Sequence, residues 1–444
     1  MEIKASRGTL IVMTTETEPA LSQLQAFLDS STSPFHAVNN AKEILLQHGF
    51  VEVYEIDDWE QGNQRNFTIR EGSLIAWAIP SQSTPENGFR IVGAHTDSPN
   101  LRIKAIQTLQ ESAFSQLSIE VYGSPLLNSW LDRDLGISGR VVLQSEPSKH
   151  VLFSTDDPIC RIPQLAIHLD REVNSSGLKL NPQSHLTPIW SDAQQNPTTF
   201  KHWLASELAL NVNEVAAWDL MLHDCQKSDY LGANNEWLAS ARIDNLVSCY
   251  AAVTSLCEIV PENIARVPVV CLFDHEEVGS VSAGGASGDF LVGILNRLMS
   301  GLTGESKAKA YANSLCLSVD GAHGSHPNYP ERHDSEHVVT LNGGIVIKKN
   351  ANQRYATDAI GEAMAKSLCE QINIPHQSFS NRNDLSCGST IGPTTAARLG
   401  VRTIDIGAPQ LSMHSIREIC GVEDQGYLKS FTEAFLRSDQ TTFE

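Results

Sequence analysis

The sequence predicts an α/β fold in which a mixed, largely parallel sheet is flanked by helices and interrupted by an inserted, β-rich domain. Four short apolar stretches have the composition of strands: "FRIVGAHTD", "RVPVVCLFDHEE", "SLCLSVDGAH" and "VRTIDIGAP". Helical patterns lie between them, and this alternation is typical of a covered parallel sheet. Residues 104–238 break the alternation, which indicates an insertion.

The helical patterns are clearest in three segments. Residues 245–260, "NLVSCYAAVTSLCEIV", repeat apolar side chains on one face of a helix. Residues 21–28 do the same near the start of the chain. A further helix is expected over residues 33–49, where Ser33 is a candidate cap, proline follows in the first turn and glycine ends the segment. Residues 1–18 have no clear periodicity, and Met13 is an alternative start to Met1.

The composition of the insertion predicts an antiparallel sheet. The stretches "QLSIEVYGSPLL", "GRVVLQ" and "HVLFS" have strand composition and follow one another closely. We therefore predict an inserted domain over residues 104–238 and a discontinuous main domain over residues 1–103 and 239–444.

Composition excludes several classes of protein. The formal net charge of −20 disfavours binding to nucleic acid or to anionic membranes, because both need a basic surface. No apolar run approaches the roughly 18 residues of a membrane span, and "TLIVM" near the start is too short for the core of a signal peptide. Nine cysteines without a C-x-x-C pair favour reduced thiols. A cytoplasmic protein is the expectation.

Polar side chains gather where the predicted strands end. In open α/β sheets, ligands bind beyond the carboxyl ends of the strands, so a site should combine residues from several of them. One further carboxylate starts the long helix. The candidates are His95, Asp97, Asp244, Glu276, Glu277, Asp320 and His414.

These residue types are suited to binding metal. Imidazole nitrogen and carboxylate oxygen are ordinary zinc ligands, and two metals about 3.5–4 Å apart are normally held together by a shared carboxylate. Adjacent carboxylates become tolerable when divalent cations offset their charge. In "AHTD", the carboxylate of Asp97 can accept the second N–H of His95 and so fix its tautomer.

Glu276 and Glu277 cannot both reach one site from a regular strand, because neighbouring side chains point to opposite faces. We therefore expect both in the turn just beyond the strand. One of them can then bind metal while the other remains free as a general base.

Each candidate also has an ordinary interpretation. Glu276 and Glu277 taken alone fit a solvated turn, Asp244 fits a helix cap, and Asp320 can begin a turn. Competing chemistries are weaker: "GSVSAGGASGD" lacks the ending of a phosphate loop, and no G-x-S-x-G elbow is present. Cys387 has no activating neighbours in the sequence and fits a small buried residue.

Eight strings in order, between about residue 33 and 430, resemble the aspartyl aminopeptidase family of dinuclear zinc peptidases. They are "GAHTDSPNLRIK", "WLDRDLGISGRV", "RIDNL", "DHEEVGS", "SVDGAHGSHPNY", "GGIVIKKNANQRYATD", "NDLSCGSTIGP" and "LSMHSIRE". The resemblance implies a zinc exopeptidase-like fold and an inserted domain that mediates dimerisation. It also implies assembly into a dodecamer built from dimers.

The resemblance also implies roles for individual residues. It places His95 and Asp320 on one zinc and Glu277 and His414 on the other, with Asp244 between them. Glu276 would be the general base, and Asp97 would orient His95. Substrate-binding roles fall to four residues: His168, which would reach the neighbouring subunit's site, Lys348, which would meet an acidic first side chain, and His323 and Tyr355.

The expected activity is removal of an amino-terminal residue, preferably Asp or Glu, from peptides, with two zinc ions per subunit or with manganese or cobalt instead. Several alternatives remain open. The enzyme could prefer neutral or apolar first residues, or be a related dimetal carboxypeptidase or deacylase. The chain could also be a non-catalytic oligomeric binding protein of the same fold. For Lys348, the alternative is a solvated lysine beside Lys349.

Overall fold

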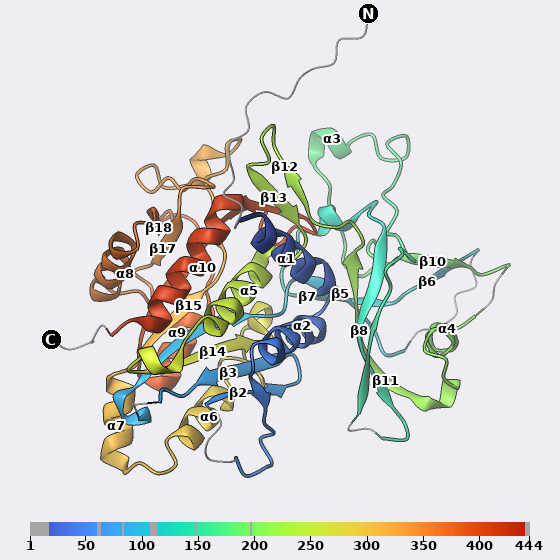
Figure 1. Ribbon diagram of the computed structural model, residues 1–444. Helices are drawn as coiled ribbons and strands as arrows, with labels where there is room; N and C mark the ends of the chain where they lie inside the picture. Colours follow the sequence, from blue (N-terminus) through green and yellow to red (C-terminus); the bar gives the residue numbers. More distant parts are fainter. Residues whose placement is uncertain are drawn as a thin grey trace, which may run out of the picture.

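The computed structural model describes residues 17–59, 64–81, 84–106, 113–146, 149–195 and 198–439 (Figure 1). Both candidate start residues, Met1 and Met13, lie outside these ranges. None of the described helices is long and apolar enough to cross a membrane. All nine cysteines are free thiols, and seven of them are buried, as expected of small core residues.

A nine-stranded mixed sheet forms the centre of the main domain, in the order β1-β2-β3-β14-β4-β15-β19-β17-β18. The middle strands β14, β4, β15 and β19 are mutually parallel, whereas β3 and β17 pair antiparallel to their inner neighbours β14 and β19. The four strands predicted from apolar stretches are these four parallel ones. The bounds are β1 Val51–Glu52, β2 Arg65–Arg70, β3 Ser73–Ala78, β14 Val267–Phe273, β4 Phe89–His95, β15 Leu315–Val319, β19 Arg402–Gly407, β17 Ile345–Lys349 and β18 His376–Ser380.

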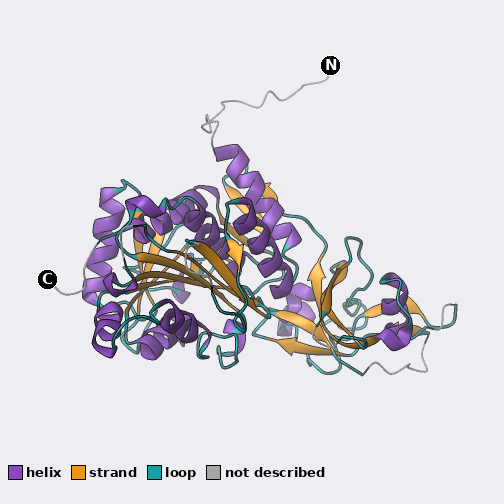
Figure 2. Ribbon diagram, turned by 60° about the horizontal axis from the view of Figure 1, so that its bottom comes forward, coloured by secondary structure: helices purple, strands orange, loops and turns teal. Residues whose placement is uncertain are grey.

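Helices cover both faces of this sheet, which is why the middle strands are apolar on both sides (Figure 2). Every residue of β4 and β14 is buried. One face packs against α1 Thr17–Ser30, α2 Pro34–Gln47, α5 Ile243–Cys257, α8 Ala359–Gln371 and α10 Val422–Arg437. The other packs against α6 Phe290–Leu298, α7 Gly304–Ala312 and α9 Ile391–Leu399.

The three helices predicted from periodicity are α1, α2 and α5. In α2 the Ser33 side chain accepts a hydrogen bond from the His36 N–H, and Pro34 occupies the first turn, as the sequence predicts. The α/β class with a mixed, largely parallel sheet is therefore confirmed.

The β-rich insertion extends from the main domain as a separate unit (Figures 1 and 2). Its antiparallel sheet has the order β7-β5-β11-β8-β9. Aromatic rings of Phe200, Trp203 and Trp218 form part of its own core. The bounds are β5 Asn100–Ile103, β6 Phe114–Gln116, β7 Ile119–Tyr122, β8 Leu135–Leu143, β9 His150–Ser154, α3 Val173–Ser176, β10 Ile189–Asp192, α4 Phe200–Glu207 and β11 Val215–Asp224.

The pairing of strands shows which strands belong to the inserted sheet. Strand β5 precedes residue 104 but pairs with β7 and β11, so the inserted sheet starts at Asn100. At the other end, β12 Asp229–Leu231 pairs with β13 Trp237–Ser240, which belongs to another sheet. The inserted sheet therefore extends from β5 to β11, whereas β12 pairs outside it.

That other sheet has five strands in the order β12-β13-β21-β20-β16 and joins distant parts of the main domain. Its remaining strands are β16 Ala322–His323, β20 Pro409–Leu411 and β21 Glu418–Gly421. The loop between β20 and β21 carries His414. This sheet therefore brings the region around His414 close to the ends of the central strands.

Candidate metal centre

Five of the candidate residues meet at the carboxyl edge of the central sheet. His95 is the last residue of β4 and lies opposite Phe273, the last residue of β14, in parallel register. Asp320 directly follows β15, the strand on the other side of β4. Glu277 follows β14 and His414 lies in the loop after β20, so parallel pairing accounts for much of the convergence.

Asp244 lies between the two histidines. Its Oδ1 is 3.4 Å from Nε2 of His95, and its Oδ2 is 3.4 Å from Nε2 of His414. Nε2 of His95 also lies 3.6 Å from Oδ1 of Asp320, and Nε2 of His414 lies 3.4 Å from Oε2 of Glu277. Asp244 thus has one carboxylate oxygen near the His95–Asp320 pair and the other near the His414–Glu277 pair.

The two adjacent glutamates lie in a short 3₁₀ turn, Glu276–Val278, that starts directly after the left-handed residue His275 (φ 68°). Because both glutamates lie in this turn and not in the strand, their side chains need not point to opposite faces of the sheet. Main-chain N–H groups of Glu276 and Glu277 donate to Oδ1 and Oδ2 of Asp97, each over 3.1 Å. Asp97 therefore holds the turn that carries both glutamates.

Hydrogen bonds fix both imidazoles. Nδ1–H of His95 donates to the main-chain carbonyl of Asp97 over 2.9 Å, and Nδ1–H of His414 donates to the carbonyl of Ser124 over 3.0 Å. We expected the carboxylate of Asp97 as the acceptor, but its Oδ1 is farther away, at 3.4 Å, and already accepts the N–H of Glu276. A carbonyl can only accept, so in both rings Nε2 is the atom that faces the carboxylates.

This arrangement needs positive charge at Nε2 of both rings. Burial alone lowers the pKa of His414, but Asp244 and Glu277 raise it to about 10. Burial likewise opposes protonation of His95, yet Asp244, Asp320 and Asp97 raise its pKa well above the ordinary value. A divalent cation between ring nitrogen and carboxylate would supply the same positive charge.

The residues fit zinc by donor type and by hydrogen bonding. Oδ1 of Asp244 and Oε1 of Glu277 are buried, and no described residue donates a hydrogen bond to either atom. Such orphaned buried oxygens are rare unless an ion or water satisfies them. One oxygen or nitrogen atom from each of His95, Asp244 and Glu277 lies within 4.8 Å of the other two. Imidazole nitrogen and carboxylate oxygen are the donor types that zinc takes.

A cavity of about 380 Å³ opens beside this cluster. Glu276 lines it, and burial together with the neighbouring carboxylates raises the pKa of Glu276 to about 8, although His95 opposes the shift. His323, Lys348 and Tyr355 line the same cavity. The site thus combines a cluster of residues that suits metal binding, a further carboxylate and a space for a ligand.

Lys348 is buried, with 1% of its surface exposed, so the alternative of a solvated lysine is wrong. Nζ donates to the carbonyls of Asp320 and Gly321 over 3.0 and 3.1 Å and lies 5.1 Å from the ring centre of Tyr355. An ammonium group has three N–H donors, so one remains for a ligand.

His168 lies elsewhere. It is exposed on the insertion, between β9 and α3, and is not among the residues that line the cavity. Within one chain, the structure does not bring it to the cluster.

Three residues that support the cluster were missed by the sequence analysis. The Tyr122 hydroxyl donates to Oδ2 of Asp97 over 2.6 Å, and the Ser98 hydroxyl donates to the carbonyl of Asp244 over 2.7 Å. The carboxylate of Glu418 accepts the main-chain N–H groups of Asp244 and His414. Ser98 and Glu418 had a signal, as residues of "GAHTDSPNLRIK" and "LSMHSIRE", but that signal gave neither of them a role.

Fold and site together define a class. Carboxylates and imidazoles converge at the carboxyl edge of a covered α/β sheet, beside a cavity lined by a further carboxylate, as expected of a metal-dependent hydrolase. The family model described as "Aminopeptidase I zinc metalloprotease (M18)" matches residues 27–436. The chain belongs to this M18 family of zinc aminopeptidases.

Individual relatives agree over nearly the whole chain. A Streptomyces avermitilis protein named "Probable M18 family aminopeptidase 2" is 47% identical over 418 residues, 93% of this chain and 96% of the relative. A Ricinus communis protein named "Probable aspartyl aminopeptidase" is 38% identical over 470 aligned positions, 94% of this chain and 96% of the relative. Among solved structures, the S. cerevisiae mApe1 dodecamer matches with a TM-score of 0.83 and 29% identity, covering 96% of this chain and 98% of that one.

Proposed function

We propose that this zinc aminopeptidase removes amino-terminal Asp or Glu residues from peptides and that it uses two zinc ions per subunit. The observation that supports the acidic preference best is the buried ammonium group of Lys348 in the wall of the cavity beside the metal cluster. The name of the Ricinus communis relative is consistent with this preference.

Five residues would hold the two ions. His95 and Asp320 would bind one, Glu277 and His414 the other, and Asp244 would offer one oxygen to each. Bound zinc polarises a carbonyl group and acidifies water. Manganese or cobalt could occupy the same set of oxygen and nitrogen donors.

Glu276 would act as the general base and acid. It lines the cavity, and its raised pKa suits a group that accepts a proton from water and returns it to a departing amine. The hydrogen bond from the Glu276 N–H to Asp97 fixes the main chain from which this carboxylate projects. Asp97 therefore has a positioning role for both Glu276 and His95.

Lys348 would select the first residue of the substrate. Its third N–H can bind the side-chain carboxylate of Asp or Glu, and an apolar side chain would leave a buried ammonium without that partner. Tyr355 packs beside the ammonium group, and His323 lines the same cavity.

His168 would act across a subunit interface. Its exposure on the insertion suits a contact with the neighbouring subunit, and the mApe1 relative is a dodecamer. We propose a similar homo-oligomer built from dimers. When inactive His168→Ala and Glu276→Gln subunits are mixed, mixed oligomers should recover part of the activity, because some sites then combine an intact His168 with an intact Glu276. Verified mixed oligomers with no recovered activity would exclude a shared site.

Hydrolysis of Asp-, Glu- and Leu-anilides, each with and without a chelator, tests the proposal. We expect Asp and Glu substrates to be cleaved faster than Leu, and all activity to stop with chelator and return with added zinc. Preferred cleavage of Leu would indicate an aminopeptidase for apolar residues. No cleavage by zinc-loaded protein would favour a binding protein.

Removing the metal should also destabilise the fold. A ligand present at a thousand times its Kd stabilises the native state by about 4 kcal/mol, and without cations the buried carboxylates of Asp244 and Glu277 lose their partners. We expect chelator to lower the Tm measured by calorimetry and added zinc to restore it. An unchanged Tm would argue against a buried metal cluster.

A further inference from the structure

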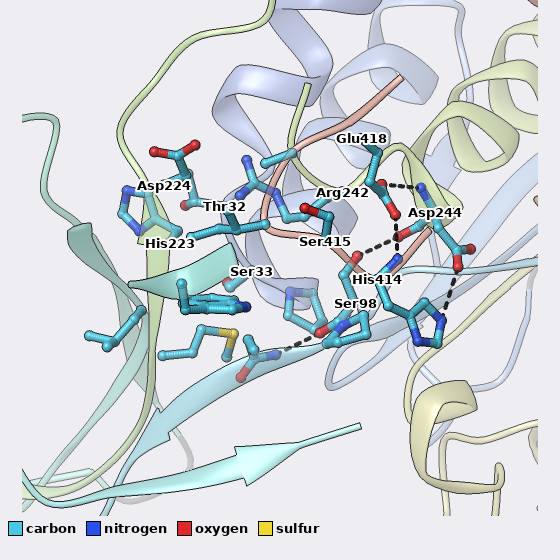
Figure 3. Close-up of a pocket in the computed structure, with 18 of the residues that line it drawn as sticks. Thr32, Ser33, Ser98, His223, Asp224, Arg242, Asp244, His414, Ser415 and Glu418 are labelled. Atoms are coloured by element: carbon cyan, nitrogen blue, oxygen red, sulfur yellow. Dashed lines mark hydrogen bonds and ion pairs between the residues drawn. The ribbon is translucent and has the colours of Figure 1, made fainter. Parts of the chain in front are cut away.

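Glu418 is a buried carboxylate directly behind the metal cluster. Only 2% of its surface is exposed. Oε2 accepts the main-chain N–H of Asp244 over 3.0 Å, and Oε1 accepts the main-chain N–H of His414 over 2.9 Å (Figure 3). The side chain of Gln410 donates a longer bond to Oε1 over 3.4 Å. Both oxygens are thus occupied by N–H donors, and two of these donors belong to proposed metal ligands.

The position of Glu418 follows from its strand. Strand β21 lies between β13 and β20 and pairs antiparallel with both. Ser240, opposite Glu418, ends β13 and comes four residues before Asp244. Strand β20 ends at Leu411, three residues before His414. Glu418 therefore lies between the two chain segments that deliver these ligands, which are 170 residues apart in sequence.

Both ligands need such a partner because their main chain is irregular. His414 has a φ of 67°, and Asp244 interrupts the start of α5 with φ −80° and ψ 104°. The N–H groups of both residues bond to the Glu418 carboxylate. Each N–H needs an acceptor oxygen, and the single carboxyl group of Glu418 supplies one to each. The main-chain carbonyl of Asp244 is also held, because it accepts a hydrogen bond from the Ser98 hydroxyl (Figure 3).

We propose that Glu418 is a positioning residue that sets the placement of His414 relative to Asp244 and thereby the affinity for the metal ion next to His414. This inference rests on the proposed metal ligands. Oδ2 of Asp244 and Nε2 of His414 are 3.4 Å apart, so a small shift of either main chain changes the space between them. Residues that orient ligands in this way typically change metal affinity by about 10- to 100-fold when replaced.

Replacement of Glu418 by Gln removes one of the two acceptors and puts an NH₂ group in its place. That group meets an N–H donor, so either Asp244 or His414 loses its bond. Glu418→Asp keeps the carboxyl group but is one methylene shorter and cannot span both N–H groups in the same way. This second variant tests the same contact with a smaller chemical change.

A matched control lies in α10. Asp424 is also fully buried, and its two oxygens accept the main-chain N–H groups of Asn342 and Gly344 over 2.6 and 2.9 Å. Asp424→Asn therefore removes one acceptor of a comparable pair, in a segment that carries none of the proposed metal ligands. A purely structural role for Glu418 would give both variants the same behaviour.

The experiment is a competition between the oligomeric protein and a chromophoric zinc chelator, with Tm measured in parallel. In Glu418→Gln and Glu418→Asp we expect one of two zinc ions to bind about 10- to 100-fold more weakly, and excess zinc to restore turnover. Asp424→Asn should lower Tm about as much as the Glu418 variants do, but it should bind both ions as wild type does.

Wild-type affinity for both ions in the two Glu418 variants would overturn the proposal, and so would equal weakening in Asp424→Asn. Fewer than two bound ions in wild type would instead overturn the proposed metal set, and the inference with it.

Discussion

Glu276→Gln should reduce kcat by roughly 10²- to 10⁴-fold, the usual contribution of general acid–base catalysis, while two zinc ions per chain remain bound. Glutamine has the shape of glutamate but cannot take a proton from water. Glu276 lines the cavity, whereas the side chain close to His414 is that of Glu277. Steady-state kinetics together with zinc content measured by mass spectrometry would check this result.

The adjacent residue provides the contrast for this prediction. Glu277→Gln makes the same chemical change one position later in the same 3₁₀ turn, and Oε2 of Glu277 lies 3.4 Å from His414 Nε2. We expect this variant to lose zinc as well as activity. If Glu276→Gln loses zinc instead, Glu276 is a ligand and the roles of the two glutamates are reversed.

Lys348→Met should remove most activity toward Asp- and Glu-anilides and leave Leu-anilide cleavage much less affected. Loss of one partner of a buried charge pair costs about 2–5 kcal/mol, which corresponds to a loss on the order of 30- to 3,000-fold. Methionine retains much of the length of the side chain but has no N–H donor. The measured quantity is the ratio of kcat/KM for Glu- to Leu-anilide.

Lys349 offers a matched control, because it is the next residue of β17 and points to the surface, where it pairs with Glu362. Lys349→Met should leave the ratio unchanged. Lys348 also binds the carbonyls of Asp320 and Gly321. If Lys348→Met loses activity equally toward all three substrates, the role of Lys348 is to hold the main chain at Asp320 and Gly321. That result would remove the basis for the acidic preference.

The fold was predictable because its signals are local. Apolar stretches that end in polar residues gave the four parallel strands, and parallel strands bring their carboxyl ends to one edge. His95 and Asp320 follow from that rule. Asp244 does not, because a carboxylate at a helix start is more often a cap, and its placement depends on irregular main chain within α5.

The supporting contacts were not predictable from sequence patterns. Glu418 reaches Asp244 only because β21 pairs with β13 across a long separation in sequence. Tyr122 reaches Asp97 from the insertion, and Ser124 of the same insertion accepts from His414. Side chains that act through long-range pairing carry no periodic signal. For the same reason, the sequence did not show that β5 pairs within the inserted sheet or that β12 pairs outside it.

The central claim is that two cations lie in a cluster of acids and imidazoles brought together from distant parts of the chain. Anomalous diffraction at the zinc absorption edge, from crystals of the zinc-loaded protein, tests it most directly. We predict two peaks per subunit, one beside His95 and Asp320 and one beside Glu277 and His414, with Asp244 contacting both. A single peak, or peaks away from Asp244, would contradict the account.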